Sequence, residues 1–390
     1  MRNTRAMYVV ASLALICAAL AACTPVSVPG SDNTPVPAAQ PAAQPAALAG
    51  ELGAPAPLVV SNLELVAQLT GEESINRTLT RFGIAGTDLG HMFDMGGRLY
   101  MVFGDTFGCC IPGTGGPGGA KDWRSNTMAV IDDQDPADGL TFAGMVTDEE
   151  AHAAQIIRPG RDDVTVIPTN GIAVGGSMYL HYMAVRRWGD PGEWDLNASG
   201  FAYSDDKGET WTKDSASGAA LWPGDSNFGQ VALVREGGFV YLFGIPGGRF
   251  GGVQLARVPE DALLDASAYH YLSGAAQDGP AWSEAPDDAA TIVPAPVGEL
   301  SVLWNEHLGR WIMTYLNEDK AALAVRSAAE LWGPWSDESI LVSGREYPQL
   351  YGAYLHPWLT ENGGETVYFT MSLWQPYNVF LMRARLALAE

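Results

Sequence analysis

Gly97-Arg-Leu-Tyr-Met-Val-Phe opens a pattern that recurs four more times along the chain. The other copies are Gly176-Ser-Met-Tyr-Leu-His-Tyr, Gly238-Phe-Val-Tyr-Leu-Phe, Gly309-Arg-Trp-Ile-Met-Thr-Tyr and Gly364-Glu-Thr-Val-Tyr-Phe-Thr. Subtraction of their residue numbers places successive first glycines 79, 62, 71 and 55 residues apart. In each copy aromatic and β-branched residues follow a turn residue, which predicts a strand. One structural unit is therefore expected five times.

Each copy lies between two other strand-like runs. The predicted first strands are Asp88–Asp94, Thr169–Val174, Gln230–Val234, Leu300–Trp304 and Tyr354–Leu359, and the predicted third strands are Asn126–Ile131, Gly200–Ser204, Val253–Val258, Ala321–Arg326 and Val379–Arg385. Helical periodicity is scarce between them. Three or four antiparallel strands repeated five times predict an all-β fold, a five-bladed β-propeller. A further run, Leu58–Leu69, is expected to close the ring against the last blade.

A β-sandwich built of similar hairpins is the alternative, and one motif argues against it. Ser204-Asp-Asp206-Lys-Gly208-Glu-Thr210-Trp211 matches the Asp-box of propeller blades. In that turn the Asp side chain can accept from backbone amides, and Gly supplies a left-handed conformation. The Trp side chain is expected to pack beneath the turn.

The N-terminus predicts a lipoprotein signal peptide over residues 1–22. Arg2 and Arg5 precede a short apolar run, and Leu20-Ala21-Ala22-Cys23 reads as a lipobox with Cys23 as the lipidation site. Residues 23–57 are rich in Ala and Pro, as in an extended linker. The propeller is expected over residues 58–390. We therefore expect an extracytoplasmic protein, held at a bacterial membrane by its lipid.

The net charge and the cysteine content of the chain limit which partners and which metal sites are expected. The formal net charge is −23, which argues against nucleic acid as a partner. Beyond Cys17 and Cys23 the only cysteines are Cys109 and Cys110, and adjacent cysteines suit no structural zinc site. A vicinal disulfide and two free thiols both remain open. The sequence gives no indication of the oligomeric state.

Residues just before each first strand and just after each second strand are expected to meet at one end of the channel. Aromatic rings there would stack on sugar faces, and amides would bond hydroxyl groups. The expected substrate-binding residues are Trp123, Asn126, Asn170, Trp188, Asn227, Gln230, Arg249, His356, Trp374, Tyr377 and Asn378. A structural role in a loop or in the core is the alternative for each of them.

Two carboxylates are expected side by side in the first blade. Gly96-Gly97 suits a two-residue type I′ hairpin, so Met95 faces Arg98 and paired residue numbers sum to 193. Asp88 and Asp105 satisfy that sum, which puts their Cβ atoms about 4.5–5.5 Å apart. One pKa should then rise, as glycoside hydrolysis requires. Cation binding, or a turn capped by Asp105, is the alternative.

Several of these segments resemble one bacterial propeller family, the endo-D-arabinofuranosidases. The matching segments are Gly86-Thr-Asp88-Leu-Gly, Gly104-Asp105-Thr-Phe-Gly, Ser125-Asn126-Thr127, Asn227-Phe-Gly-Gln230-Val-Ala, Gly247-Gly-Arg249-Phe-Gly-Gly and Tyr377-Asn378-Val. The resemblance covers roughly Leu58 to Leu388. It implies hydrolysis within D-arabinan, the furanose polymer of arabinogalactan and lipoarabinomannan. The family's essential acidic pair would fall on Asp88 and Asp105.

The sequence thus predicts a two-carboxylate glycoside hydrolase that needs no cofactor or metal, although a structural cation in the channel stays open. A non-catalytic glycan-binding or scaffold propeller is one alternative, because fold does not imply function. A glycosidase for another glycan is the second. A sialidase would need an arginine cluster, and few arginines are expected at this end of the channel.

Overall fold

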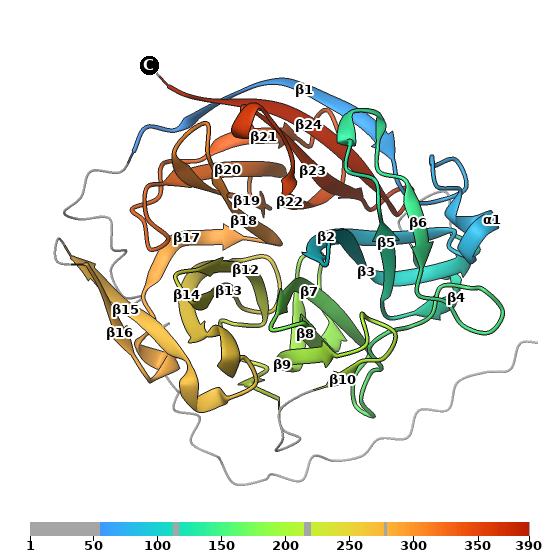
Figure 1. The fold of residues 1–390 in the computed structure, drawn as a ribbon, viewed down its shortest axis with the longest axis horizontal. Coiled ribbons are helices and arrows are strands. Elements are labelled where there is room, and N and C mark those ends of the chain that lie inside the picture. The colour runs from blue at the N-terminus through green and yellow to red at the C-terminus, as the bar shows by residue number, and fades with distance from the viewer. Residues whose placement is uncertain (1–54, 112–116, 214–219, 277–278, 390) are drawn as a thin grey trace, which may run out of the picture. The chain divides into compact units, whose positions relative to one another are not determined.

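The computed structural model describes residues 55–111, 117–213, 220–276 and 279–389, and the predicted signal peptide and Cys23 lie outside these residues. Five antiparallel sheets stand around a central channel like the blades of a propeller (Figure 1). The innermost strand of each sheet contacts the innermost strands of both neighbouring sheets, which closes the ring. The fold predicted from the repeats is confirmed.

Each predicted strand triplet forms the inner part of one blade. The first blade contains β2 (Gly86–Met95), β3 (Arg98–Cys109), β4 (Lys121–Arg124), β5 (Thr127–Ile131) and β6 (Phe142–Met145). The second contains β7 (Thr165–Val174), β8 (Ser177–Trp188), β9 (Trp194–Ser204), β10 (Thr212–Lys213) and β11 (Trp222–Pro223). The third contains β12 (Gln230–Glu236), β13 (Phe239–Ile245), β14 (Gly251–Pro259), β15 (His270–Ala276), β16 (Gly279–Ser283) and β17 (Thr291–Val297).

The last two blades complete the ring. The fourth contains β18 (Leu300–Asn305), β19 (Arg310–Asn317), β20 (Ala322–Ala328) and β21 (Ser339–Ser343). The fifth contains β22 (Leu350–Glu361), β23 (Thr366–Leu373), β24 (Asn378–Leu388) and β1 (Leu58–Gln68). The described helices are short: α1 (Thr78–Phe82) and the 3₁₀ turns Pro136–Asp138, Glu260–Ala262, Ala266–Ala268, Pro286–Asp288 and Asn362–Gly364.

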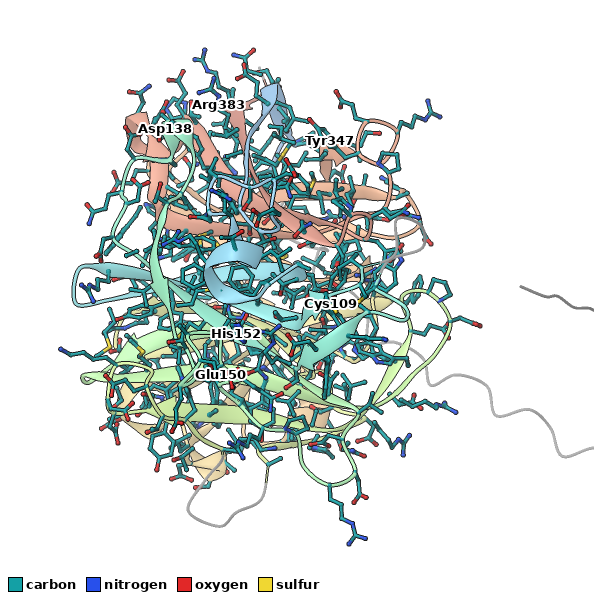
Figure 2. All side chains as sticks on the ribbon, turned by 90° about the vertical axis from the view of Figure 1, so that its right-hand side faces the viewer. Cys109, Asp138, Glu150, His152, Tyr347 and Arg383 are labelled. Atoms are coloured by element: carbon teal, nitrogen blue, oxygen red, sulfur yellow. The ribbon has the colours of Figure 1, made fainter. Side chains whose placement is uncertain are left out.

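Strand β1 joins the two ends of the propeller, as the sequence predicted. It runs antiparallel to β24, so the blue and red strands lie side by side in Figure 1. Across this pair Glu64 faces Arg383, and their side chains form a 2.5 Å ion pair. Arg383 is labelled in Figure 2, which views the ring from its side.

The innermost hairpins of three blades use the same turn. The central glycines Gly96-Gly97, Gly175-Gly176 and Gly237-Gly238 all have positive φ, which is the conformation of a type I′ turn. In the first blade this turn pairs Met95 with Arg98, as predicted.

Cys109 ends β3, and Figure 2 shows it on the outer side of the first blade. Cys109 and Cys110 are exposed, with their Sγ atoms 2.7 Å apart. The vicinal disulfide and the two free thiols both stay predictions. Hydrogen bonding to Cys110 raises the pKa of the Cys109 thiol.

The Asp-box forms the turn after β9 with the predicted contacts. The Asp206 carboxylate accepts from the backbone N–H of Thr210 at 2.9 Å, and the hydroxyl of Ser204 donates to it at 2.7 Å. Gly208 has φ +90°, and the indole N–H of Trp211 donates to its carbonyl at 3.0 Å. Trp211 packs against the buried side chains between the first two blades.

Replacing Gly208 by alanine should destabilise the fold. A left-handed backbone costs a non-glycine residue about 1–3 kcal/mol. A Cβ at this position would also lie 2.4 Å from Cε of Met128. Gly97→Ala is the matched control, since φ is +81° there and a Cβ would meet nothing within 4 Å. Urea unfolding should give a larger loss for Gly208→Ala, and equal losses would contradict the Met128 contact.

Candidate functional site

Asp88 and Asp105 lie on adjacent strands at one end of the channel. Strands β2 and β3 keep the predicted register from Met95 to His91 and again at Thr87. Between those points the register shifts by one residue and then shifts back. The prediction of an uninterrupted register is therefore wrong. The two irregularities cancel, so Asp88 still lies beside Asp105.

Gly104 makes room for the Asp88 carboxylate. A Cβ at residue 104 would lie 2.5 Å from Asp88 Oδ1. No side chain fits at that distance, so glycine here allows the close approach. The carboxylate of Asp88 consequently lies over the residue that precedes Asp105.

The half-buried Asp88 carboxyl group lies between two tyrosines. The hydroxyl of Tyr351 donates to Asp88 Oδ2 at 3.0 Å, and Tyr377 also hydrogen-bonds to this carboxyl. Oδ1 is buried and has no hydrogen-bond partner in the described part of the chain. Burial, followed by the charge of Asp105, raises the pKa of Asp88 to about 7. The raised pKa expected for one member of the pair is thus present.

Asp105 has a different set of partners. Its Oδ1 accepts from the indole N–H of Trp123 and from the hydroxyl of Thr165, both at 2.7 Å. Burial raises the pKa of Asp105 to about 6, while these two donors oppose the rise by stabilising the ionised form. The two carboxyl groups therefore differ in environment, with the higher pKa on Asp88.

Arg249 lies across the site from the first blade, in a cage of acidic and aromatic groups. Its Nε and Nη2 donate to Glu299 Oε1 at 2.9 and 2.8 Å, and its Nη1 donates to Glu318 at 2.9 Å. Its guanidinium lies 4.9 Å from the ring centre of Tyr351 and 5.7 Å from that of Trp194. Burial alone would lower the pKa of Arg249, but the two carboxylates outweigh it and raise the pKa.

Four amides expected to bind substrate make hydrogen bonds within the protein. The side chains of Asn126, Asn227, Gln230 and Asn378 hydrogen-bond to the protein itself. Gln230, for example, donates to the carbonyls of Pro246 and Gly248, in the loop that carries Arg249. Fixing these loops satisfies buried polar groups. These contacts fix the loops around the site, and substrate binding by the four amides stays a prediction.

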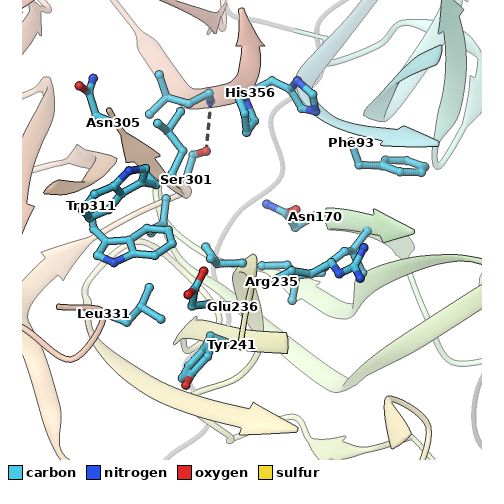
Figure 3. A pocket seen from close by; sticks show the side chains of 18 of the residues that line it. Phe93, Asn170, Arg235, Glu236, Tyr241, Ser301, Asn305, Trp311, Leu331 and His356 are labelled. Carbon is cyan, nitrogen blue, oxygen red and sulfur yellow. Dashed lines mark hydrogen bonds between the residues drawn. The ribbon is translucent and has the colours of Figure 1, made fainter. Parts of the chain in front are cut away.

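Asn170 and His356 are not at the carboxylate end. Both line a separate cavity farther along the channel (Figure 3). The predicted strand began at Thr169, which put Asn170 near its start, but β7 begins at Thr165, five residues before Asn170. Similarly, β22 begins at Leu350, so His356 falls beyond its middle. Their expected position beside Asp88 is wrong.

Two other predicted residues are exposed tryptophans that contact buried rings of the site. Trp374 is 41% exposed and meets Tyr377 edge to face, at 5.7 Å between ring centres. Trp188 is 46% exposed and meets Trp194 in the same way at 5.8 Å. Together with Trp123, at 42% exposure, they offer flat apolar surfaces at the edge of the site.

The sequence missed four groups at this site: Thr165, Trp194 as a partner of Arg249, Glu299 and Tyr351. Thr165 and Tyr351 lie in segments that were left outside the predicted first strands. Glu299 immediately precedes a correctly predicted first strand. Residues in that position were expected at this end of the channel, so the same reasoning could have found Glu299. Its Oε2 is buried without a partner among the described residues.

The described ranges contain no group of three or more His, Cys, Asp and Glu side chains arranged to hold a metal ion. Within the same ranges, no helix has the length and apolar character needed to cross a membrane.

Fold and site together define a five-bladed propeller with a half-buried carboxylate pair at one end of its channel. The chain belongs to the family described as "Domain of unknown function (DUF4185)", whose profile matches residues 73–383.

Two fungal proteins are similar over most of this chain. One is the notoamide biosynthesis cluster protein J of Aspergillus sp. (strain MF297-2), 30% identical over 80% of this chain and 86% of its own length. The other is protein J' of Aspergillus versicolor, 29% identical over 83% of this chain and 90% of its own length. Neither name states a reaction.

A solved structure, titled as a putative hydrolase from Bacteroides ovatus ATCC 8483, shares the fold. Its TM-score is 0.57 at 15% identity, over 79% of this chain and 88% of that chain.

The raised pKa of Asp88 makes folding stability depend on pH. A carboxyl with a higher pKa in the folded state binds more protons when folded, so stability falls as pH rises between the two values. For Asp88 this interval runs from 3.8 to about 7. Asp88→Asn removes the titration and should gain stability over the parent across that interval, by about 1.4 kcal/mol per pKa unit.

Urea unfolding at pH 4 and at pH 8 measures this effect. Asp287→Asn, which alters an exposed carboxylate, is the control and should follow the parent at both pH values. If the free energies of unfolding of Asp88→Asn and the parent differ by the same amount at pH 4 and pH 8, the raised pKa of Asp88 is contradicted.

Proposed function

We propose that this protein is a glycoside hydrolase that cleaves internal D-arabinofuranosyl linkages of D-arabinan. The observation that carries the proposal is the pair Asp88 and Asp105, which lie half-buried side by side at the mouth of a channel and have different partners. Two neighbouring carboxyl groups with separated pKa values are what acid–base glycoside hydrolysis requires.

The environments of the two carboxyl groups suggest their roles. Asp88 has the higher pKa, about 7, so it would stay protonated near neutral pH and protonate the leaving-group oxygen. Asp105, with a pKa of about 6, accepts from Trp123 and Thr165, and both donors favour a carboxylate. Asp105 would therefore act as the nucleophile or as the base that activates water.

A neutral saccharide fits the surroundings of the pair. Exposed rings of Trp123, Trp188 and Trp374 can stack on sugar faces. Arg249, the guanidinium of the site, is already bound by two carboxylates, so little positive charge is left to attract an anionic substrate. D-arabinan in particular is supported by the resemblance to endo-D-arabinofuranosidases around Asp88 and Asp105. The Bacteroides protein of the same fold is itself titled a putative hydrolase.

The proposed location follows from the N-terminal sequence. A lipid on Cys23 and the Ala- and Pro-rich linker would hold the propeller on the outer side of a bacterial membrane. There the enzyme would meet polysaccharide.

Substitution of either carboxylate should abolish hydrolysis. Purified D-arabinan-containing arabinogalactan is incubated with the protein, and released oligosaccharides are separated by chromatography. Asp88→Asn and Asp105→Asn should each lose about 10²–10⁴-fold in rate, because general acid–base catalysis contributes that much. Asp287→Asn is the control. Failure of the folded parent to act on a substrate that another arabinanase digests would favour a non-catalytic glycan-binding propeller.

The pH dependence of kcat/KM tests the two roles separately. We expect a maximum between about pH 6 and 7, because the pKa of Asp105 is about 6 and that of Asp88 about 7. Tyr351→Phe removes a donor that lowers the pKa of Asp88, so the alkaline limb should move to higher pH. Trp123→Phe removes a donor to Asp105, so the acid limb should move to higher pH. If Tyr351→Phe moves the acid limb and Trp123→Phe moves the alkaline limb, the roles assigned to Asp88 and Asp105 are reversed.

A further inference from the structure

A second cavity lies in the channel, lined by different residues from those around Asp88 and Asp105. Its volume is about 1030 Å³, which is ample for a small oligosaccharide. Its walls come from β2, β7, β12, β18 and β22, the innermost strands of all five blades (Figure 3). Nothing in the proposed reaction uses this cavity.

The cavity wall carries two buried hydrogen-bond donors that the protein does not use. Asn170 is 8% exposed, and its Oδ1 accepts from the backbone N–H of Gly171 at 2.9 Å. This contact fixes the amide orientation, so the Nδ2 amino group is left over, and Figure 3 shows the side chain directed into the cavity. Ser301 is 4% exposed, and its Oγ accepts from Leu355 N–H at 3.1 Å, which leaves its hydroxyl proton free. Neither group donates to any described residue.

An aromatic surface stands at the same cavity. Trp304 and Trp311 face each other across β18 and β19 and meet edge to face, with ring centres 5.4 Å apart. Trp311 is buried, while Trp304 is 42% exposed. The pair therefore holds one indole in a fixed position with much of its surface open to a ligand.

The charges of the cavity exclude an anion. Asp94, Glu236, Glu306 and Glu330 line it, against Arg235, whose Nη2 is already paired with Glu260 at 2.5 Å. The lining histidine, His356, lies 3.4 Å from Asp94. The acidic residues would attract a cation, but a cation offers no acceptor to the Asn170 amide and the Ser301 hydroxyl. A neutral ligand rich in acceptor oxygens avoids repulsion by the acidic residues and can accept from both donors.

We propose that this cavity is a second, non-catalytic binding site for a neutral saccharide. The ring oxygens and hydroxyls of the sugar would accept from Asn170 and Ser301, and one sugar face would stack on Trp304. The site goes beyond the proposed hydrolysis and does not depend on it. It would let one chain hold a polysaccharide at two places.

The test uses the full chain carrying Asp88→Asn and Asp105→Asn, so that glycans are bound without being cut. Isothermal titration calorimetry is run with short linear D-arabino-oligosaccharides, with cello-oligosaccharides as a second neutral probe, and with oligogalacturonides as an anionic probe. We expect two neutral saccharides per chain. Trp304→Ala and Asn170→Ala should each weaken one of the two sites by roughly tenfold or more. Trp304→Phe keeps an aromatic face and should retain most of the affinity.

Trp123→Ala is the matched control, because it should weaken only the site at the carboxylate end. Each variant should have the same thermal unfolding temperature as the parent, which shows that its fold is intact. If no neutral saccharide responds to either cavity variant, or if the anionic probe binds best there, the inference is overturned. If cello-oligosaccharides bind the cavity while D-arabino-oligosaccharides bind nowhere, the inference holds and the proposed D-arabinan specificity fails.

Discussion

The pairing of β1 with β24 is the constraint on which the rest of the structure depends. It joins the first strand of the domain to the last, so the five sheets form a ring. Only in a closed ring does β22 lie beside β2. That contact brings Tyr351 to Asp88, although the two residues are 263 positions apart in the chain. The backbone N–H of Thr87 likewise donates to the carbonyl of Tyr377 at 2.9 Å across the same junction.

Closure also explains how the carboxylate pair persists despite its cost. Burying an ionisable carboxyl without full hydrogen bonding destabilises a protein. Asp88 is half-buried with one oxygen atom buried and unpartnered among the described residues, and Asp105 lies half-buried beside it. Hydrogen bonds from Tyr351 to Asp88 and from Trp123 and Thr165 to Asp105 keep both groups in place. These hydrogen bonds hold the two carboxyl groups in fixed positions.

Local sequence rules predicted the parts of this structure that depend on near neighbours. The Gly96-Gly97 turn, the pairing of Met95 with Arg98 and the Asp-box contacts all form within a few residues. Prediction was weaker for the candidate site, because its strand starts were assigned too late in two blades. Asn170 and His356 were consequently expected at the wrong end of the channel. The catalytic role of Asp88 and Asp105 stays a prediction.

The sequence by itself determined the five repeated hairpins, the all-β class and the nearness of Asp88 to Asp105. Alternating side chains and paired glycines specify strands and tight turns through short-range sterics, so these features can be recognised from the chain alone. Only the tertiary structure decided that Tyr351 meets both Asp88 and Arg249, and that Asn170 faces a cavity away from the pair. The reason is physical: these contacts join different blades, and their geometry exists only after long-range packing has closed the ring.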